Sequence, residues 1–407
     1  MLEAGYPDSI NVIRCKAVSL LVLLLTGATA LCADRVETID LRTVVGSVAS
    51  IGPKGVQLSA DGNEHVLPLA DVEAVFLREA EGLMTRGGQS VIVTVAGDTL
   101  AADEVRVADG KIRFESPAVG SLELSLKVVG FVYLPRRGEE PGAVIRKCLS
   151  IKRAAEATDD LIVDRGKEWS AVQGILLALR DGKITFRLRD EDRQIDTRHV
   201  KAIRLAIPHG QWTPAGSLIA ADGSEILFSS LKLQGEELAV ESRSMGALKI
   251  ARRNVASIRF VSERVVPLAD LKPASVEEHG LFDAKFPHRL NKSVGGGPIR
   301  LKGLTYSSGI GLNSYSQLTY RLDGKYTRFV ALAGIDDAVR PAGNATLSFL
   351  ADDKPLGRPI HLTGKDDPVG VNLDLTGAKT FTIRVDFGRD ELPVGDHVDL
   401  ASARLIK

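Results

Sequence analysis

Apolar and polar residues alternate along most of the chain between residues 36 and 262. Stretches such as VRVADGKIRF and KITFRLR have the period of two that is typical of half-buried β-strands. The alternation is interrupted at Asp109-Gly110, Asp181-Gly182 and Asp222-Gly223. An Asp-Gly pair tolerates the positive φ that a two-residue hairpin turn requires. The pattern therefore predicts short antiparallel strands joined by tight turns.

The middle of the chain contains one pattern twice. A shift of 128 residues places the block that begins at Gly46 on the block that begins at Gly174, and the apolar positions coincide while the polar ones differ. A repeated fold with different surfaces gives this result, because packing constrains the core face of a strand and not its solvent face. We expect two tandem small antiparallel β-barrel or β-sandwich modules, residues 36–135 and 161–262. A linker with a short helix is expected at 136–160.

The first residues have the pattern of an export signal. Basic residues precede an apolar run from Ala17 to Leu31, which is shorter than the roughly 20 apolar residues that span a bilayer. We expect residues 1–33 to be a signal peptide, and the protein to be secreted or to lie in the periplasm or cell envelope, with no membrane span after cleavage. An uncleaved anchor and a lipidated Cys32 are the alternatives.

Four spaced motifs occur in the last third of the chain, residues 265–407. They are Gly309-Ile-Gly311, Leu318-Thr-Tyr320-Arg-Leu322, Gly324-Lys-Tyr326-Thr-Arg-Phe329 and Gly334-Ile-Asp336-Asp337. In this order they resemble the NPCBM family of carbohydrate-binding modules, in which a Gly-Ile-Gly turn comes first. The resemblance implies a jelly-roll β-sandwich of the galactose-binding type. Such a module serves elsewhere as a non-catalytic, sugar-binding appendage of secreted glycosidases.

The resemblance also suggests where a sugar would bind. Sugar rings bind largely by stacking on flat aromatic faces, with a few hydrogen bonds from amides and carboxylates. Both tryptophans, Trp169 and Trp212, lie outside this third of the chain. We therefore expect Asn313, Tyr315 and Asp336 to be ligand-binding residues. Asn313 stands where the family often has His, and Asp336 has the alternative role of capping backbone donors in a turn.

A calcium ion is the single cofactor that the residues suggest. Asp396 and Asp399, on either side of His397, could supply oxygen ligands for structural Ca²⁺, and a solvated turn is the alternative. The seven histidines show no pair at the spacing of metal ligands on a helix. No other cofactor is predicted.

Charge and cysteine content narrow the function further. The 52 basic and 52 acidic residues give zero net charge, which argues against a nucleic-acid partner. Cys148 is the one cysteine beyond the signal region, so a disulfide framework is excluded, and its lone thiol is expected to be inert. Because nucleophile and phosphate-loop motifs are absent from the sequence, we do not expect an enzyme.

Two functions remain. The first is an exported, non-catalytic protein whose C-terminal module binds a glycan or an extracellular polysaccharide. The alternative is an envelope or extracellular scaffold that binds other proteins through its β-modules.

Overall fold

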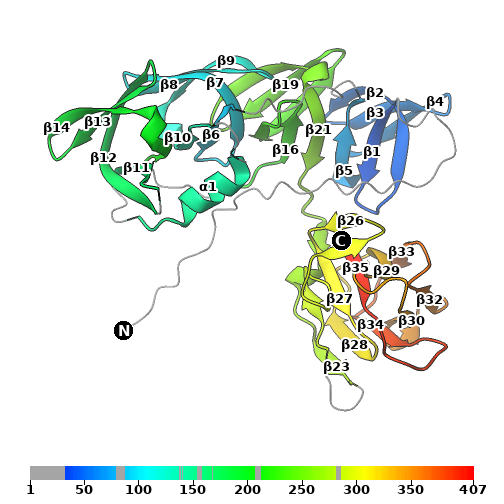
Figure 1. Ribbon diagram of the computed structural model, residues 1–407. Coiled ribbons are helices and arrows are strands. Elements are labelled where there is room, and N and C mark those ends of the chain that lie inside the picture. Colours follow the sequence, from blue (N-terminus) through cyan, green and yellow to red (C-terminus); the bar gives the residue numbers. More distant parts are fainter. Residues whose placement is uncertain are drawn as a thin grey trace. The chain divides into compact units, whose positions relative to one another are not determined.

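The computed structural model describes residues 33–78, 88–136, 139, 141–153, 158–166, 168–206, 212–280 and 286–407. These residues form two compact units. Unit 1 holds residues 33–37 and 43–261 of the described chain, and unit 2 holds residues 38–42 and 262–407. Nearly all regular structure is β (Figure 1), which confirms the predicted all-β class. Within these ranges no helix combines the length and the apolar character of a membrane span. Residues 1–32 of the predicted signal peptide lie outside the described residues.

One order of elements occurs four times in unit 1: strands, a single 3-10 turn and a closing strand. Segment 1 contains β1 (Asp34–Thr38), β2 (Thr43–Gly52), β3 (Gly55–Ala60), β4 (Asn63–Leu67), η2 (Leu69–Asp71) and β5 (Val72–Phe76). Segment 2 contains β6 (Ser90–Thr94), β7 (Thr99–Ala108), β8 (Lys111–Ser116), β9 (Gly120–Ser125), η4 (Leu126–Val128) and β10 (Val129–Tyr133). Each predicted module spans two such segments.

The second predicted module has the same composition. Segment 3 contains β11 (Asp159–Asp164), β12 (Trp169–Arg180), β13 (Lys183–Leu188), β14 (Glu191–Asp196), η5 (Thr197–His199) and β15 (Val200–Arg204). Segment 4 contains β16 (Gly216–Ala220), β17 (Glu225–Phe228), β18 (Ser230–Gln234), β19 (Glu237–Ser242), β20 (Gly246–Ala251), η6 (Arg252–Asn254) and β21 (Val255–Phe260). In segments 1 to 3 a β-bulge bends the long second strand, so that it pairs in two sheets of a small barrel.

Two of the predicted Asp-Gly turns have the expected hairpin geometry. Asp109 and Gly110 have φ of 51° and 70° between β7 and β8, and Asp181 and Gly182 have φ of 51° and 72° between β12 and β13. Positive φ at both central residues is the conformation that lets a two-residue loop follow the twist of its strands. At the third turn, between β16 and β17, Gly223 has φ of 83°.

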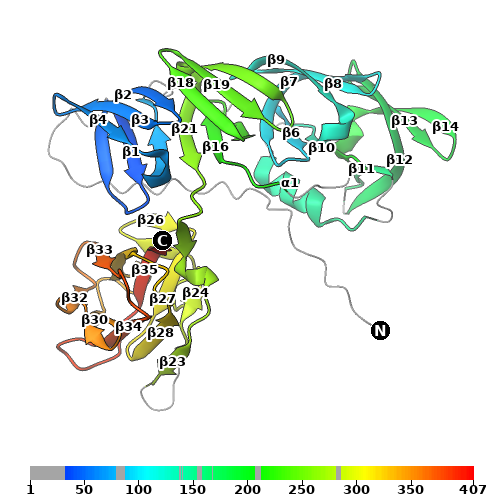
Figure 2. The same ribbon diagram turned by 180° about the vertical axis from the view of Figure 1, so that it is seen from behind.

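The segments pair across the two predicted modules. Closing strands β10 and β15 pair antiparallel, and so do β5 and β21, which joins segment 2 to segment 3 and segment 1 to segment 4. The long strands add the pairs β7 with β12 and β2 with β18, and Figure 2 shows β18 beside β2. Residues 36–135 and 161–262 therefore share hydrogen-bonded strands within unit 1.

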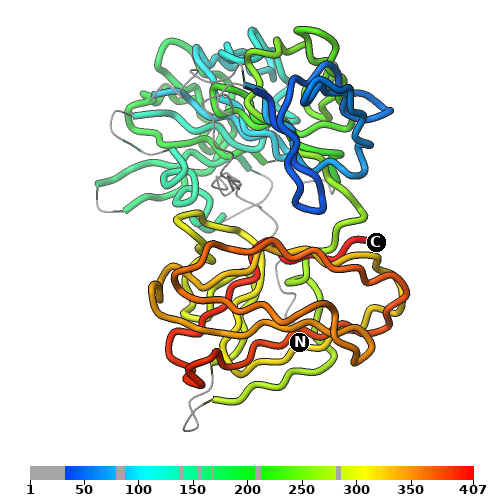
Figure 3. Tube along the Cα trace, turned by 90° about the vertical axis from the view of Figure 1, so that its right-hand side faces the viewer, coloured from blue at the N-terminus to red at the C-terminus, as the bar shows by residue number. Residues whose placement is uncertain are grey.

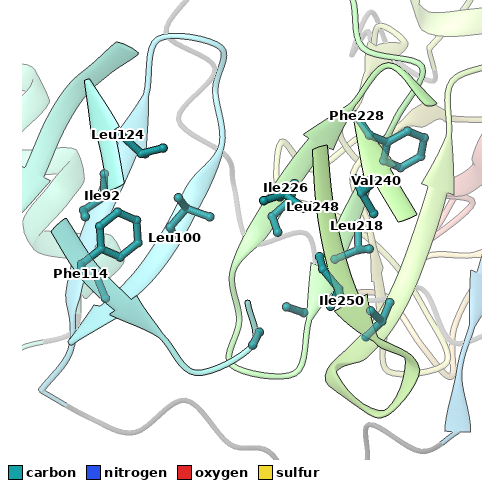
Figure 4. Close-up of a cluster of buried hydrophobic side chains, with 14 of the residues drawn as sticks. Ile92, Leu100, Phe114, Leu124, Leu218, Ile226, Phe228, Val240, Leu248 and Ile250 are labelled. Carbon is teal, nitrogen blue, oxygen red and sulfur yellow. The ribbon is translucent and has the colours of Figure 1, made fainter. Parts of the chain in front are cut away.

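Apolar side chains of the segments are buried inside unit 1. Figure 4 shows Ile92, Leu100, Phe114 and Leu124 of segment 2 in one group. A second group comes from segment 4: Leu218, Ile226, Phe228, Val240, Leu248 and Ile250. The alternation in the sequence predicts this arrangement, because every second side chain of a strand faces the same side.

Helix α1 (Pro141–Ser150) lies in the predicted linker and packs on the outer face of the β10 and β15 pair. Its Val144 and Cys148 contact the cluster that contains Phe131 and Tyr133. Burial raises the pKa of the Cys148 thiol to about 11, which keeps it protonated near neutral pH.

Unit 2 is a sandwich of two antiparallel sheets (Figures 1 and 2). One sheet has β24 (Arg289–Leu290), β27 (Gly309–Leu312), β35 (Val398–Ile406), β29 (Arg328–Ile335) and β33 (Val369–Asp374), with β22 (Val265–Pro267) on β35. The other has β23 (Ser275–Glu278), β28 (Ser316–Arg321), β34 (Thr380–Phe387), β30 (Asn344–Ala351) and β31 (Lys354–Pro355), with β32 (Ile360–Thr363) on β30. The turn η7 (Leu268–Asp270) and the hairpin of β25 (Ile299–Leu301) and β26 (Leu304–Tyr306) complete the unit. Figure 3 shows its strands, coloured yellow to red, running side by side.

The facing sides of the two sheets enclose the core of unit 2. Phe329, Phe349 and Phe381 form its centre, with ring centroids 4.7 to 6.0 Å apart. The expected Gly-Ile-Gly turn is wrong, since Gly309 and Gly311 lie in strand β27. A Cβ on Gly311 would lie 2.6 Å from backbone atoms of the chain that crosses it, so close approach and not a turn explains this glycine.

Candidate functional site

Three loops meet at one end of the unit 2 sandwich. Leu312 of β27 and Ile335 of β29 both pair with Val398 of β35, so these strand ends lie level. The loop after β27, the loop after β29 and the loop before β35 consequently come together. All five predicted site residues lie in these loops or at the beginning of β35.

Asp396, in the loop before β35, is hydrogen-bonded to the loop after β27 and to the first residue of β30. The Ser314 hydroxyl donates to Asp396 Oδ2 at 2.5 Å, and the Asn344 amide donates to Oδ1 at 2.9 Å. The Asp396 side chain is fully buried, and this burial raises its pKa. Because both of its carboxyl oxygens accept hydrogen bonds from the protein, Asp396 positions these loops.

Asp336 and Asp399 form a buried carboxyl pair beneath the hairpin of β25 and β26. The Ala338 amide donates to Asp336 Oδ1 at 2.9 Å, and the Arg300 amide lies 3.3 Å from Oδ2. Asp399 has no exposed surface, and burial together with the neighbouring Asp336 carboxyl raises its pKa to about 10. Asp399 therefore carries a proton at neutral pH.

Asp337 caps backbone donors, as the turn interpretation of this dipeptide expects. Its two carboxyl oxygens accept from the amides of Lys302 and Gly303 at 2.8 and 2.6 Å. These bonds fasten the turn between β25 and β26 to the loop after β29.

A calcium site at Asp396 and Asp399 stays a prediction. Calcium takes six to eight oxygen ligands, mostly from ionised carboxylates and carbonyls. Both Asp396 oxygens accept hydrogen bonds from the protein, whereas neither Asp399 carboxyl oxygen has a hydrogen-bond partner among the described residues. In the part of the chain that the structure describes, no group of three or more His, Cys, Asp or Glu side chains is arranged to hold a metal.

Asn313 and Tyr315 lie in the loop after β27. Asn313 is 3% exposed, and its Nδ2 donates to the Ser314 carbonyl at 2.9 Å. Tyr315 is half-buried, and its ring stacks on the exposed His279 with centroids 5.5 Å apart. The Tyr315 hydroxyl donates to Gln317 Oε1 at 3.3 Å. Of the three predicted ligand-binding residues, Tyr315 alone reaches the surface, because Asp336 is 1% exposed.

Phe286 supplies exposed ring surface at the same end, beside the half-buried His397. Phe286 is 48% exposed, and its ring centroid lies 6.4 Å from that of His397. Burial lowers the pKa of His397, while Asp336 and Asp396 act in the opposite direction. A neutral imidazole offers one donor and one acceptor. Phe286 is not among the predicted site residues. The sequence did offer a signal for it, because Phe286 is an aromatic residue in a stretch that lacks the alternation of a strand.

The comparisons with known proteins concern this part of the chain. Residues 264–406 match the NPCBM/NEW2 domain. The match confirms the resemblance of the last third of the chain. A stretch of 90 residues is 31% identical to a Renibacterium salmoninarum protein named "Putative endo-alpha-N-acetylgalactosaminidase". This stretch is 22% of the present chain and only 6% of that protein.

Two solved structures are similar to the chain at low scores. CBM51 from Clostridium perfringens GH95, in complex with methyl-galactose, is 22% identical, with a TM-score of 0.32 over 35% of this chain and 99% of that chain. CBM51-2 with GlcNAc and the INT domains from Clostridium perfringens ZmpB is 21% identical, with a TM-score of 0.32 over 44% of this chain and 38% of that chain.

Proposed function

We propose that the NPCBM/NEW2 domain of this chain binds a carbohydrate at the loop end of its sandwich, and that the chain itself catalyses no reaction. The match of residues 264–406 to this domain carries the proposal. The exposed ring surface at the loop end supports it, because an aromatic face and a few convergent polar groups are what a sugar ring requires.

Phe286 and His397 have complementary roles in the proposed site. The 48% exposed Phe286 ring offers a flat apolar face to the C–H side of a sugar. The imidazole of His397, whose pKa is lowered, accepts a hydrogen bond from a sugar hydroxyl or donates one to it. Tyr315 lines the edge of the site, held by its ring contact with His279.

The buried acidic residues hold this surface in place. Asp396 ties the Tyr315 loop to the loop that carries His397, through Ser314. Asp336 receives a hydrogen bond from Ala338, and the Asp336 amide donates to the His397 carbonyl at 2.9 Å. A binding surface held by buried hydrogen bonds loses little conformational entropy when the ligand arrives.

The proposed ligand ends in galactose or N-acetylgalactosamine. The support is the relative that is 31% identical over 90 residues, which is named as an N-acetylgalactosaminidase. Galactose is included because its ring has the same stereochemistry as that of N-acetylgalactosamine. A glycan of this kind on a cell surface or in an extracellular polymer also agrees with the predicted export signal. The alternative function, a scaffold that binds proteins through unit 1, stays a prediction.

A glycan array probed with the full chain tests the proposal. We expect retention on glycans that end in galactose or N-acetylgalactosamine, and at least tenfold weaker retention for Phe286→Ala. Ile175→Ala is the matched control, because Ile175 is also exposed, at 51%, but lies on strand β12 of unit 1. Retention that is absent from every glycan, or that is equal in the two variants, would overturn the proposal.

A further inference from the structure

Unit 1 contains a cavity of about 400 Å³ that is open to the surface, between segments 2 and 3. Its walls include Leu134 and Leu179, which are apolar, and the hydroxyl side chains of Ser90 and Thr197. Arg136 and Arg198 also line it, and none of the nine described residues that line it is acidic. A volume of this size suits a small organic ligand.

The same place is filled in the other pair of segments. In segment 1, Asp34 accepts hydrogen bonds from the Val48 amide at 2.8 Å and from the Arg78 amide at 3.0 Å. Arg252, the first residue of η6 in segment 4, brings Nη2 to 2.5 Å from Asp34 Oδ2. Its Nη1 donates to the Val48 carbonyl at 2.7 Å. A buried ion pair thus occupies the contact between segments 1 and 4.

Segment 3 repeats the aspartate. Asp159 accepts hydrogen bonds from the Leu176 amide at 2.8 Å and from the Ala206 amide at 2.9 Å. Both aspartates lie at the beginning of the first strand, and both accept from the long second strand and from the residue two positions beyond the closing strand. Segments 1 and 3 therefore share a carboxylate at this place, whereas the first strand of segment 4 begins at Gly216.

Segment 2 departs from this pattern on both sides of the cavity. Ser90 stands at the beginning of its first strand, where segments 1 and 3 have aspartate. Pro135 follows its closing strand and has no amide hydrogen to donate. From segment 3, Thr197 is the first residue of η5, the place that Arg252 takes in η6. Two small side chains replace an ion pair, and this explains why space remains.

Arg136 brings a guanidinium group to the cavity. Its Nη2 donates to the Arg198 carbonyl, which links the two segments, and its Nη1 lies 3.7 Å from Asp164 Oδ2. Arg136 Nε is buried without a hydrogen-bond partner among the described residues. A guanidinium with an unused N–H favours a carboxylate acceptor.

We propose that this cavity binds a small carboxylate with an apolar substituent, whose charged group takes the place that the aspartate carboxylate has in segments 1 and 3. Leu134 and Leu179 contact the apolar part, and Arg136 with the hydroxyls of Ser90 and Thr197 receives the carboxylate. The carboxylate belongs either to a free organic acid or to the C-terminus of a peptide.

Titration calorimetry of the full chain with four probes tests the proposal. The probes are 4-phenylbutyrate, its amide, the tetrapeptide Ala-Ala-Val-Leu and the same tetrapeptide with an amidated C-terminus. We expect at least one carboxylate probe to bind and its amide to bind at least tenfold more weakly. Binding of phenylbutyrate alone identifies a free acid as the source, and binding of the tetrapeptide identifies a peptide C-terminus. Failure of both carboxylates, or equal binding of the amides, would overturn the proposal.

Two variants locate the binding. Ser90→Asp combined with Thr197→Arg copies the ion pair of the other segment pair into the cavity, and we expect it to abolish binding while the chain stays folded. Arg136→Gln is expected to weaken binding at least tenfold without filling the cavity, so it decides the matter if the double variant does not fold. Arg253→Gln is the control. Arg253 has in η6 the position that Arg198 has in η5, but it is not among the residues that line the cavity. Undiminished binding by Arg136→Gln would contradict the assignment.

Discussion

Replacing Asp399 by Asn should remove a pH dependence from the stability of unit 2. Asp399 is fully buried in β35, and its pKa is raised to about 10 in the folded protein. In the unfolded chain an aspartate has a pKa near ~3.9. Folding therefore takes up a proton over the whole range between these two values.

This proton determines the direction and the size of the change in stability with pH. A raised carboxyl pKa means that the folded state binds more protons than the unfolded state, so stability falls as the pH rises from about 4 to about 10. One proton changes the free energy of unfolding by about 1.4 kcal/mol per pH unit. Between pH 6 and pH 8 unit 2 should thus lose about 3 kcal/mol through this group. The asparagine of the variant takes up no proton and is nearly the same size.

Urea unfolding at pH 6, 7 and 8 measures the effect. Four of the six tyrosines and neither tryptophan lie in residues 262–407, so near-ultraviolet tyrosine dichroism follows unit 2. Tryptophan emission follows unit 1 as an internal control. We expect the free energy of unfolding of Asp399→Asn to rise relative to that of the wild type by about 3 kcal/mol from pH 6 to pH 8. Histidines titrate alike in both proteins and cancel.

An exposed carboxylate supplies the matched control. Hydrogen bonds with Thr376 lower the pKa of Asp374, which is exposed, so it is ionised at all three pH values. Asp374→Asn should leave the slope unchanged. A slope that is the same in Asp399→Asn and in the wild type would refute the reasoning.

Three further outcomes are expected. Arg252→Ala leaves the buried Asp34 carboxylate without its cation and should destabilise unit 1 by about 3 kcal/mol in tryptophan-monitored unfolding; a loss under ~1 kcal/mol would contradict the ion pair. Gly311→Ala places a Cβ against backbone atoms and should cost about 1 to 3 kcal/mol in unit 2, whereas Gly370→Ala, with open space around it, should stay within ~0.5 kcal/mol. Cys148, with a pKa of about 11 and no exposed surface, should react with a disulfide reagent at pH 8 on the order of 100-fold more slowly than an exposed cysteine, and rapid labelling of native protein would show that α1 opens.

The strand pattern of unit 1 could be predicted because local rules govern it. Alternation and Asp-Gly pairs determine hairpins such as β7 to β8, and Asp109 and Gly110 have the positive φ that these rules require. Which segments pair is a different matter. The contact of β10 with β15 and that of β5 with β21 depend on the fit of whole surfaces, and no local signal separates a partner in the same module from one in the next.

The site shows the same division. The motifs identify the domain. Asp336 lies within one of them and Tyr315 between two of them, and the fold places both residues at one end of the sandwich. Burial could not be inferred from them, because Asn313 and Asp336 are polar residues in loops and are nevertheless 3% and 1% exposed. Asp336 accepts hydrogen bonds from backbone amides and Asn313 donates one through Nδ2, although Asn313 Oδ1 has no partner among the described residues. Phe286 reaches the site from a separate part of the sequence, and only the folded chain places it beside His397.

The most direct test of carbohydrate binding is an NMR titration of the full chain, labelled at phenylalanine and histidine. The titrant is an oligosaccharide that ends in galactose or N-acetylgalactosamine. We predict saturable shifts at Phe286 and His397, and no shift at Phe131 of unit 1. Shifts confined to unit 1, or spectra unchanged at saturating sugar, would contradict the proposed site.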